Sequence, residues 1–317
     1  MKIGIVGAGA LGLTFAAGLA AAHDVVVLAR RADVADALAR DGIAVEDDSG
    51  TRRVRLHASA APRALAECDA VVVAVKAYAT VDALAPLRGI LSADTLVASV
   101  QNGLDAAADA RTALPGARVV AGSTTQGAIR LGETHVQRVN DGTTVFARDD
   151  SPRHPDDSPR HPELVEGRAS PTSDDLVAAF TAAGLDAHVA DDIATILWRK
   201  LIVNAAINPL GALARVTNGA VGTDPDLVPL ARGLAAEAAA VAAAEGIAPG
   251  DPWALVEGVA LTAAANRNSM LQDLDAGRPT EIEAISGAIA RRAQRYGIAV
   301  PLTETVLRLV RARERAR

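Results

Sequence analysis

The chain has 317 residues, of which 50% are hydrophobic and 22% are charged, and its formal net charge is -6 at pH 7. This length is too great for one ordinary compact core and predicts two domains, while the composition excludes a chain that is disordered as a whole. The negative charge argues against a nucleic-acid partner, because phosphate binding favours a basic surface. The only cysteine, Cys68, cannot form an intramolecular disulfide or make a zinc site, which indicates a reducing compartment.

An apolar segment near the start, Leu11–Ala22, has two interpretations: the core of a signal peptide behind Lys2, or the first helix of a fold. The strand-like run Ile3–Val6 and the glycines that precede the segment favour the fold. No run approaches the roughly 18 apolar residues without a charge that a membrane helix needs. We therefore expect a cytoplasmic protein without a membrane partner.

The first half of the chain alternates short apolar runs with amphipathic ones, in the order strand, helix, strand. The strands are rich in β-branched residues and lack polar alternation, which is typical of a parallel sheet covered by helices on both faces. The predicted fold class is therefore α/β. The runs that predict strands are Lys2–Val6, Val25–Ala29, Ala70–Val75, Thr95–Val100, Ala117–Ala121, His135–Val139 and Thr143–Ala147. The last two flank Asn140-Asp141-Gly142, a good hairpin turn, so they can form an antiparallel pair.

Residues 149–172 interrupt this pattern with a duplicated segment that is rich in proline and charge. The sequence Asp-Ser-Pro-Arg-His-Pro occurs at residues 150–155 and again at residues 157–162. His154 and His161 raise the alternative of a metal site, but the prolines preclude a regular helix and neither histidine has a nearby ligand set. We therefore expect an inserted polar surface loop and no metal site.

A helix from Asp174 and a short strand at Asp186–Ala190 complete the first predicted domain, residues 1–190. Residues 191–317 look helical throughout and form the second. Its first helix can begin at the caps Asp191 and Asp192 and end near Asn208, because the following Pro209 disfavours helical geometry at the residue before it. Further helices are predicted near 226–245, 252–275, 281–296 and 302–315, with a capping box at Thr280 and Glu283 and a carboxyl-terminal cap at Gly297.

A glycine-rich turn, Gly7-Ala8-Gly9-Ala10-Leu11-Gly12, lies between the first strand and a helix, which is the context of a dinucleotide-binding loop. The first glycine permits the tight turn, the second lets a pyrophosphate approach the backbone, and the third lets helix and strand pack closely. Amides at the start of the helix then bind the anion. Flavin enzymes share this pattern, so it predicts a bound dinucleotide without saying which one.

The end of the second strand indicates the cofactor. NAD enzymes usually have an acidic residue there against the ribose hydroxyls, whereas this chain has Arg30 and Arg31. A guanidinium suits a 2′-phosphate, so we expect NADP as NADPH. At least one of these arginines is expected simply to face solvent. Arg30 follows the strand directly and is our candidate for the phosphate.

Polar residues also follow two later strands, at the carboxyl ends where ligands bind to open parallel sheets. Lys76 ends the run Val71–Val75, and Asn102 follows Val97–Val100. Taken alone, a lysine after a strand is more often solvated, and Asn-Gly is a common turn. These two residues are therefore candidates only in combination with others.

Lys200, Asn204 and Asn208 share one side of a predicted helix whose other positions are mainly apolar. Burial of a lysine and two amides is costly unless polar groups meet them, and the carbonyl and hydroxyl of a substrate would do so. From the spacing alone, a polar stripe that faces solvent is the alternative.

In their order and spacing, from residue 1 to about residue 310, these motifs resemble those of the ketopantoate reductases. The resemblance rests on Gly7–Gly12, the Val-Lys end at Lys76, Gln101-Asn102-Gly103, Trp198 to Pro209, Asn266 to Asp273, and Thr280-Glu281-Ile282. It implies a doubly wound Rossmann domain and an all-helical domain like that of 6-phosphogluconate dehydrogenase, with catalysis in the cleft between them. The insert at 149–172 departs from the family pattern without affecting a site residue.

The resemblance also implies the roles of single residues. Lys200 matches the catalytic lysine, and Glu281 matches the acidic residue that interacts with that lysine and with bound ligand. Lys76 and Asn102 match residues between nicotinamide and substrate. Without the resemblance, the helix dipole alone would explain Glu281. Four residues match contacts to the hydroxyl and carboxylate of the substrate, and one matches an acidic position of open role: Asn204, Asn208, Asn266 and Ser269, and Glu237.

The implied function is NADPH-dependent reduction of 2-dehydropantoate (ketopantoate) to pantoate, in pantothenate and coenzyme A biosynthesis, with a small 2-keto acid as the partner. A second interpretation is a related reductase or dehydrogenase of another branched 2-keto or 2-hydroxy acid, because the apolar residues of the pocket set that choice. A third is a non-catalytic NADPH-binding sensor, which would not need Lys200 and Glu281 together. The oligomeric state is open, with a homodimer as one option.

Overall fold

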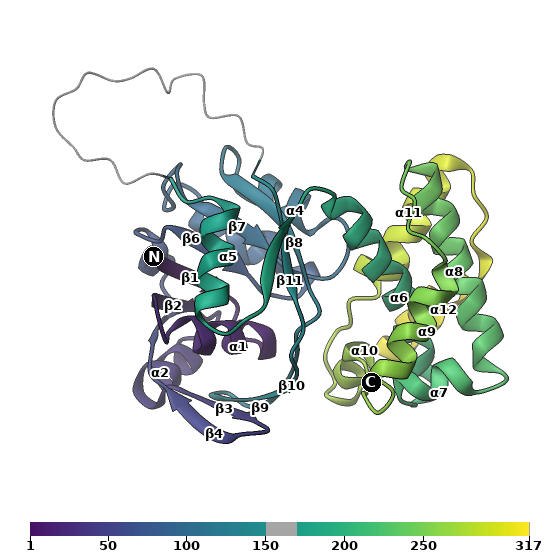
Figure 1. Cartoon of the computed structure of the whole chain (residues 1–317), viewed down its shortest axis with the longest axis horizontal. Helices are drawn as coiled ribbons and strands as arrows, with labels where there is room; N and C mark the ends of the chain where they lie inside the picture. Colours follow the sequence, from purple (N-terminus) through teal and green to yellow (C-terminus); the bar gives the residue numbers. More distant parts are fainter. Residues whose placement is uncertain (150–169, 317) are drawn as a thin grey trace. The chain divides into compact units, whose positions relative to one another are not determined.

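The computed structural model describes residues 1–149 and 170–316. These residues form two compact units (Figure 1). The first unit comprises Met1–Gln101 and Ala106–Ile193, and the second comprises Asn102–Asp105 and Ala194–Arg317. A short segment that follows a strand of the first unit is therefore part of the second. Most of the predicted insert at 149–172, with His154 and His161, lies outside the described residues.

The first unit is built on an eight-stranded sheet with the order β12-β11-β8-β7-β6-β1-β2-β5. In the order of the sheet, the strands β5, β2, β1, β6, β7 and β8 are parallel to one another. β11 is antiparallel to β8, and β12 is parallel to β11. The order of the chain reverses between β1 and β6, and ligands bind at such switch points. The strands are β1 (Lys2–Val6), β2 (Asp24–Leu28), β5 (His57–Ser59), β6 (Ala70–Val73), β7 (Leu96–Ser99), β8 (Arg118–Thr124), β11 (Thr144–Ala147) and β12 (Ala187–Ala190).

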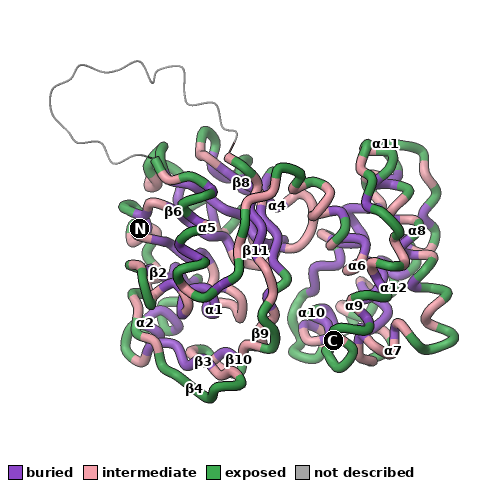
Figure 2. Tube along the Cα trace, viewed as in Figure 1, coloured by how far each residue is buried: buried purple, intermediate pink, exposed green. Residues whose placement is uncertain are grey.

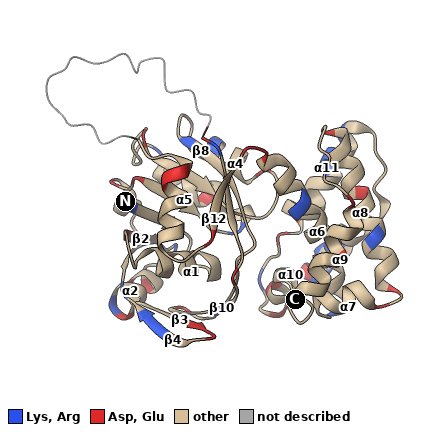
Figure 3. Ribbon diagram, in the orientation of Figure 1, with Lys and Arg blue, Asp and Glu red and all other residues tan. Residues whose placement is uncertain are grey.

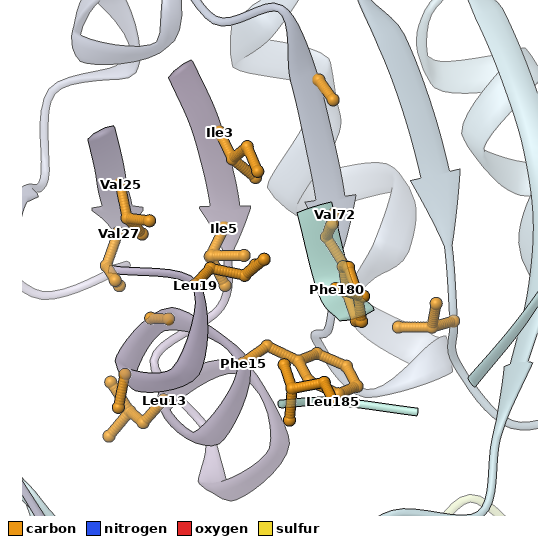
Figure 4. Close-up of a cluster of buried hydrophobic side chains, with 14 of the residues drawn as sticks. Ile3, Ile5, Leu13, Phe15, Leu19, Val25, Val27, Val72, Phe180 and Leu185 are labelled. Atoms are coloured by element: carbon orange, nitrogen blue, oxygen red, sulfur yellow. The ribbon is translucent and has the colours of Figure 1, made fainter. Parts of the chain in front are cut away.

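Both faces of this sheet are buried, as the continuous β-branched runs predict (Figure 2). On one face, Ile3 and Ile5 pack with Phe15 of α1 (Ala10–Leu19) and Phe180 of α5 (Ser173–Ala182), whose rings meet edge to face at 5.1 Å (Figure 4). The same cluster buries one side of α2 (Ala32–Asp41). The opposite face packs against α3 (Thr80–Leu84), α4 (Ala106–Ala113) and the short helices η1 (Pro62–Leu65) and η3 (Ala85–Leu87).

The first unit also contains a second sheet, of four strands in the order β4-β3-β10-β9. Its strands are β3 (Ile43–Asp47), β4 (Gly50–Val54), β9 (Gly127–Gly132) and β10 (His135–Asn140). The predicted pairing of the strands on either side of residues 140–142 is wrong, because β10 pairs with β9 and β3 while β11 pairs with β8 and β12. Residues 140–142 instead contact the link between β8 and β9, where Asn140 Nδ2 donates to the Thr125 carbonyl.

The second unit is helical, as predicted, but α6 (Ile193–Ala214) does not end near Asn208. Pro209 lies inside the helix, and the residues that follow it, Leu210, Gly211 and Ala212, are buried. Burial of this apolar turn offsets the hydrogen bond that proline cannot donate. Other helices of the unit are α7 (Asn218–Thr223), α8 (Leu227–Ala244), α9 (Pro252–Thr262), α10 (Ser269–Asp275), α11 (Ala288–Tyr296) and α12 (Pro301–Arg315), with one π-helical turn, η4 (Glu283–Gly287).

The helix predicted over 252–275 is two helices, because residues between them bind elsewhere. The Asn218 amide donates to the Asn266 carbonyl, and Asn268 Oδ1 accepts from the Leu271 amide and so caps α10. The predicted capping box at Thr280 also does not form, because its amide donates to Glu314 while the Glu283 carboxylate binds Arg311. The predicted cap at Gly297 is confirmed by its left-handed conformation, with φ 66°.

Among the described residues one helix, α8, is long and apolar enough to cross a membrane by length and composition alone. It contains Arg232 and Glu237, in keeping with the absence of a long uncharged run. Its apolar residues Leu234 and Val241 are buried in the core of the helical unit.

Candidate functional site

The three glycines of the loop after β1 are needed for three different reasons. Gly7 has φ +116°, and a Cβ there would lie 2.8 Å from Val75 Cγ1. A Cβ on Gly12 would lie 2.0 Å from the Gly7 carbonyl oxygen, so helix and turn touch. Gly9, in contrast, has nothing within 4 Å of its Cβ position. The backbone is therefore packed at both ends of the loop and open at its middle, where a pyrophosphate would approach.

The helix that follows this loop has no side-chain cap. Its cap residue is Gly9, and Ala8, Ala10 and Leu11 are only half-buried. The first amides of a helix have no partner within the helix and attract anions. This arrangement has the features that the sequence predicts for a phosphate cradle, and the contact itself stays a prediction.

The two arginines that follow β2 differ in their surroundings. Arg31 binds Asp33 and also pairs with Glu133, whose Oε1 lies 2.9 Å from its Nη2. Arg30 is exposed and forms no hydrogen bond or ion pair with any other described residue. Arg30 therefore has a guanidinium available for a phosphate, while that of Arg31 is already engaged.

Lys76 lies at the switch point of the sheet. It follows β6, whose Val73 pairs with Val6 at the end of β1, and it directly precedes the short helix η2 (Ala77–Ala79). The adjacent Val75 contacts Gly7 of the glycine loop. Lys76 is half-buried, and the fold thus brings its segment beside the cofactor loop although 69 positions separate Gly7 from Lys76.

Asn102 and Glu281 meet within the helical unit. Asn102 Nδ2 donates to Glu281 Oε2 over 2.8 Å, and the Glu281 side chain is buried. Glu281 precedes the π-helical turn, and its carbonyl accepts hydrogen bonds from the Ala284 and Ile285 amides. These bonds fix the backbone of Glu281, and Asn102 binds its carboxylate.

Lys200 belongs to the same site because Glu281 acts on its charge. Burial lowers the pKa of Lys200 to about 8, and the nearby Glu281 carboxylate opposes this shift. Arg199 and Lys200 are the only charged residues of α6, which is visible in Figure 3 as a basic stretch in an otherwise uncharged helix. The α6 sequence thus carries a lysine with a low pKa on a helix that is apolar on most of its sides.

Asn204 and Asn208 follow Lys200 at intervals of one helical turn. Asn204 is half-buried and Asn208 is 5% exposed. Neither side chain forms a hydrogen bond with another residue in the described part of the chain. Two amides in an apolar helix with unused hydrogen-bonding capacity suit a polar ligand.

Asn266 and Ser269 are not on one helix, contrary to the helix predicted near 252–275. Asn266 lies in the loop before α10, and Ser269 is the first residue of α10; both are exposed. Asn268, which the sequence argument passed over, is the buried residue of this segment and caps α10. An Asn directly before an apolar run is a helix-start pattern that would have identified it.

Glu237, whose role the sequence left open, caps α12. Its Oε1 accepts from the Leu302 amide at 2.8 Å and its Oε2 accepts from the Thr303 amide at 2.7 Å. A carboxylate at the amino-terminal end of a helix satisfies unpaired amides and interacts favourably with the helix dipole. Glu237 is therefore a structural residue that joins α8 to α12.

Comparison with known proteins relates the chain to the ketopantoate reductases, the family that its sequence motifs resemble. The family model described as "Ketopantoate reductase PanE/ApbA" matches residues 3–151, and its carboxyl-terminal counterpart, "Ketopantoate reductase PanE/ApbA C terminal", matches residues 192–314. The 2-dehydropantoate 2-reductase of Archaeoglobus fulgidus is 34% identical over 99% of this chain and 98% of its own.

Solved structures also resemble the whole chain. The PanE/ApbA family ketopantoate reductase from Ralstonia eutropha JMP134 has a TM-score of 0.87 and 31% identity, and the match covers 100% of this chain and 99% of that one. D-mandelate dehydrogenase in complex with NADH has a TM-score of 0.84 and 25% identity, with the same coverage of 100% and 99%. The fold, a doubly wound Rossmann sheet with a helical carboxyl-terminal unit, is that of these proteins.

Proposed function

The chain belongs to the ketopantoate reductase family, and from that membership we propose that it reduces 2-dehydropantoate to pantoate with NADPH, in pantothenate and coenzyme A biosynthesis. Relatives named 2-dehydropantoate 2-reductase align with nearly all of it, which supports an oxidoreductase that acts on a CH–OH group. Residues 1–190 would bind the cofactor. Residues 191–317, together with Asn102, would bind the small 2-keto acid.

The residues of the first unit fit a nicotinamide dinucleotide. The open backbone at Gly9 and the uncapped start of α1 suit a pyrophosphate, which residues Gly7 to Gly12 would hold. Arg30, which is exposed and unpaired among the described residues, would bind the 2′-phosphate of NADPH. Lys76 and Asn102 would lie between nicotinamide and substrate. When bound, NADPH supplies the hydride that reduces the keto carbon.

Lys200 would supply the proton. Negative charge develops on the keto oxygen during reduction, so a donor must lie within hydrogen-bond reach of that atom. A lysine with a pKa near 8 is mostly protonated at neutral pH and releases its proton more readily than an ordinary lysine. The proton would pass from Lys200 Nζ to the substrate oxygen. Glu281 would orient the ammonium and help to keep it charged.

The polar ends of the substrate would be held by four residues of the helical unit. Asn204 and Asn208 lie on the α6 positions that follow Lys200 and have unused hydrogen-bonding capacity. Asn266 and Ser269 are exposed near the start of α10 and would contact the carboxylate and hydroxyl ends. A site of this kind rejects acids that lack matching groups, because its buried amides would then stay unpaired.

The observation that carries the proposal is the set Lys200, Glu281 and Asn102, in which one buried carboxylate accepts the Asn102 amide and acts electrostatically on the lysine. The test is to measure kcat/KM for a panel of 2-keto acids with NADPH and with NADH. We expect ketopantoate with NADPH to be the best pair. NADPH binding without turnover of any acid would indicate the sensor instead.

The likeness to D-mandelate dehydrogenase favours a second candidate, a dehydrogenase of another 2-hydroxy acid. Phenylglyoxylate, the 2-keto acid that corresponds to mandelate, therefore belongs in the panel. A higher kcat/KM with phenylglyoxylate and NADH than with ketopantoate and NADPH would assign the chain to this candidate.

A further inference from the structure

The segment Asn102–Asp105 follows β7 of the first unit, yet it is part of the helical unit. Asn102 binds Glu281, as described above. Gly103 has φ +94°, and a Cβ there would lie 2.8 Å from the Ala284 carbonyl oxygen, so its backbone rests on the π-helical turn. Leu104 packs against the core of the helical unit. Three consecutive residues, 102 to 104, thus contact the helical unit. The partner of Asn102 lies 179 positions further along the chain.

The last residue of the segment, Asp105, is held by two arginines of α11. Asp105 Oδ1 lies 2.5 Å from Arg292 Nη2, and Asp105 Oδ2 lies 3.3 Å from both Arg292 Nη1 and Arg291 Nη2. The Arg292 side chain is 12% exposed, whereas that of Arg291 is 50% exposed. Of the two arginines, Arg292 is the less exposed and makes the shorter bond, so the ion pair between Arg292 and Asp105 fixes Asp105 more firmly than the pair with Arg291.

Arg292 connects this segment to the helix of the candidate proton donor. Its Nε lies 3.1 Å from Glu245 Oε1, and Glu245 Oε2 accepts a hydrogen bond of 3.2 Å from Trp198 Nε1. Trp198 is 2% exposed and lies two positions before Lys200 on α6. A single path of ion pairs and hydrogen bonds therefore runs from Asp105 through Arg292 and Glu245 to α6.

The charges in this path favour their paired forms. Burial acts to raise the pKa of Asp105, but hydrogen bonds from Arg292 and Arg291 outweigh it, so the pKa is lowered. Burial acts to lower the pKa of Arg292, but the carboxylates of Asp105 and Glu245 outweigh it, so the pKa is raised. Loss of Arg292 would leave Asp105 with Arg291, whose side chain is 50% exposed, and an exposed ion pair of that kind holds a carboxylate only weakly.

We propose that Arg292 is a positioning residue for the reaction: by holding Asp105 it keeps the 102–105 segment on the helical unit and Asn102 against Glu281. The guanidinium binds Asp105 and Glu245. Loss of Arg292 would leave the hydrogen bond between Trp198 and Glu245 in place, so its effect on the reaction would pass through Asp105 and Asn102. The effect on turnover rests on the function proposed above.

A double-mutant cycle tests this inference. Arg292→Met should lower kcat/KM for the keto acid roughly 10- to 100-fold, the scale of a small misplacement in an active site. In an Asn102→Ala background the same change should have little further effect, because the residue that Arg292 positions is then gone. The Kd for NADPH should change little in either background.

Arg311→Met is the matched control. Arg311 also pairs with a carboxylate beside the π-helical turn, since its Nη2 lies 2.8 Å from Glu283 Oε2, but it does not touch the 102–105 segment. We expect it to leave kcat/KM close to that of the wild type. Equal losses from Arg292→Met in the two backgrounds, or equal losses from Arg292→Met and Arg311→Met, would overturn the inference.

Hydrogen exchange gives a readout that does not depend on turnover. The Ala284 and Ile285 amides, which donate to the Glu281 carbonyl at the turn on which Gly103 rests, should exchange faster in Arg292→Met. They should also exchange faster in Asp105→Asn, which removes the same ion pair with a smaller change in shape. Arg292→Lys should restore part of the protection. If the wild type turned over no 2-keto acid, the proposed function would fail while this experiment still decided the positioning role. Unchanged exchange of the Ala284 and Ile285 amides in both variants would overturn it.

Discussion

Asn102 and Glu281 are joined by a hydrogen bond of 2.8 Å, and they are 179 positions apart in the sequence. The carboxylate that receives this bond also acts on Lys200 and opposes the lowering of its pKa by burial. The protonation of Lys200 therefore depends on a residue that a strand-end loop of the first half of the chain holds in place.

The first prediction concerns the pH dependence of turnover. Burial lowers the pKa of Lys200 to about 8, so the acid form is lost as pH rises, and kcat should fall through about pH 8. Glu281→Gln removes the charge that raises this pKa and should move the basic limb to lower pH by about 1 unit. Lys200→Ala should lower kcat roughly 10²- to 10⁴-fold and abolish that limb. A Lys200→Ala enzyme with the wild-type profile would show that another group is the acid.

The second prediction concerns the stability of the folded chain. The pKa of Lys200 is 10.5 in the unfolded chain and about 8 in the folded one, so below about pH 8 the folded state is penalised for its proton. The penalty disappears as pH rises from about 8 to 10.5. Lys200→Met should therefore raise the free energy of unfolding at pH 7 by about 1–3 kcal/mol. The lower part of this range allows for screening by solvent, because the side chain is only half-buried. Urea denaturation at pH 7 and at higher pH measures this.

The control for this experiment is Lys2→Met. Lys2 pairs with Glu67 at the surface, and a hydrogen bond from its ammonium to that carboxylate raises its pKa. Its removal should give no stabilisation at pH 7. A gain of equal size in the two variants would mean that loss of charge in general, and not burial of Lys200, is the cause.

The third prediction concerns cofactor choice. Arg30→Ala should weaken NADPH binding by roughly 10- to 100-fold, since a hydrogen bond to a charged group contributes about 1.5–3 kcal/mol, and should leave NADH binding nearly unchanged. Arg31→Ala is the matched control, because Arg31 is already paired with Asp33 and Glu133. Titration of each variant with both cofactors measures the effect. Equal weakening of NADPH and NADH by Arg30→Ala would contradict the assignment.

The fourth prediction concerns Glu237, which caps α12. Glu237→Gln should lower the free energy of unfolding by about 1–2 kcal/mol, because the helix loses a charged cap. Turnover of the folded enzyme should be unchanged. Glu304→Gln, on the exposed first turn of α12, is the control and should have a smaller effect. A large loss of kcat without loss of stability would instead place Glu237 in the chemistry.

Features that depend on neighbouring residues could be predicted from the sequence. The glycine loop after β1 and the cap at Gly297 are examples, because the backbone conformation of a few residues decides them. Pairing over long distances could not be predicted. The strands on either side of residues 140–142 have local turn chemistry for a hairpin, but each finds better partners elsewhere, with Phe146 of β11 buried beside Phe180.

The candidate site divides in the same way. The positions of Lys200, Asn204 and Asn208 on one side of α6 follow from helix periodicity. The break between α9 and α10 depends on the hydrogen bond between the Asn218 amide and the Asn266 carbonyl, which sequence spacing does not reveal. The role of Glu237 as the cap of α12 likewise depends on tertiary packing over 65 positions.

The place of the 102–105 segment limits how this protein can be taken apart. A fragment that begins at residue 194 would contain α6 to α12 but would lack Asp105 and Asn102. Arg292 would then keep Glu245 but lose Asp105, and the Glu281 carboxylate would lose its amide donor. The helical unit is therefore not a self-contained module that one cut releases. Exchange of this unit between relatives, by recombination or by design, would have to carry the four residues 102–105 with it, or supply a matching set of charges in the recipient.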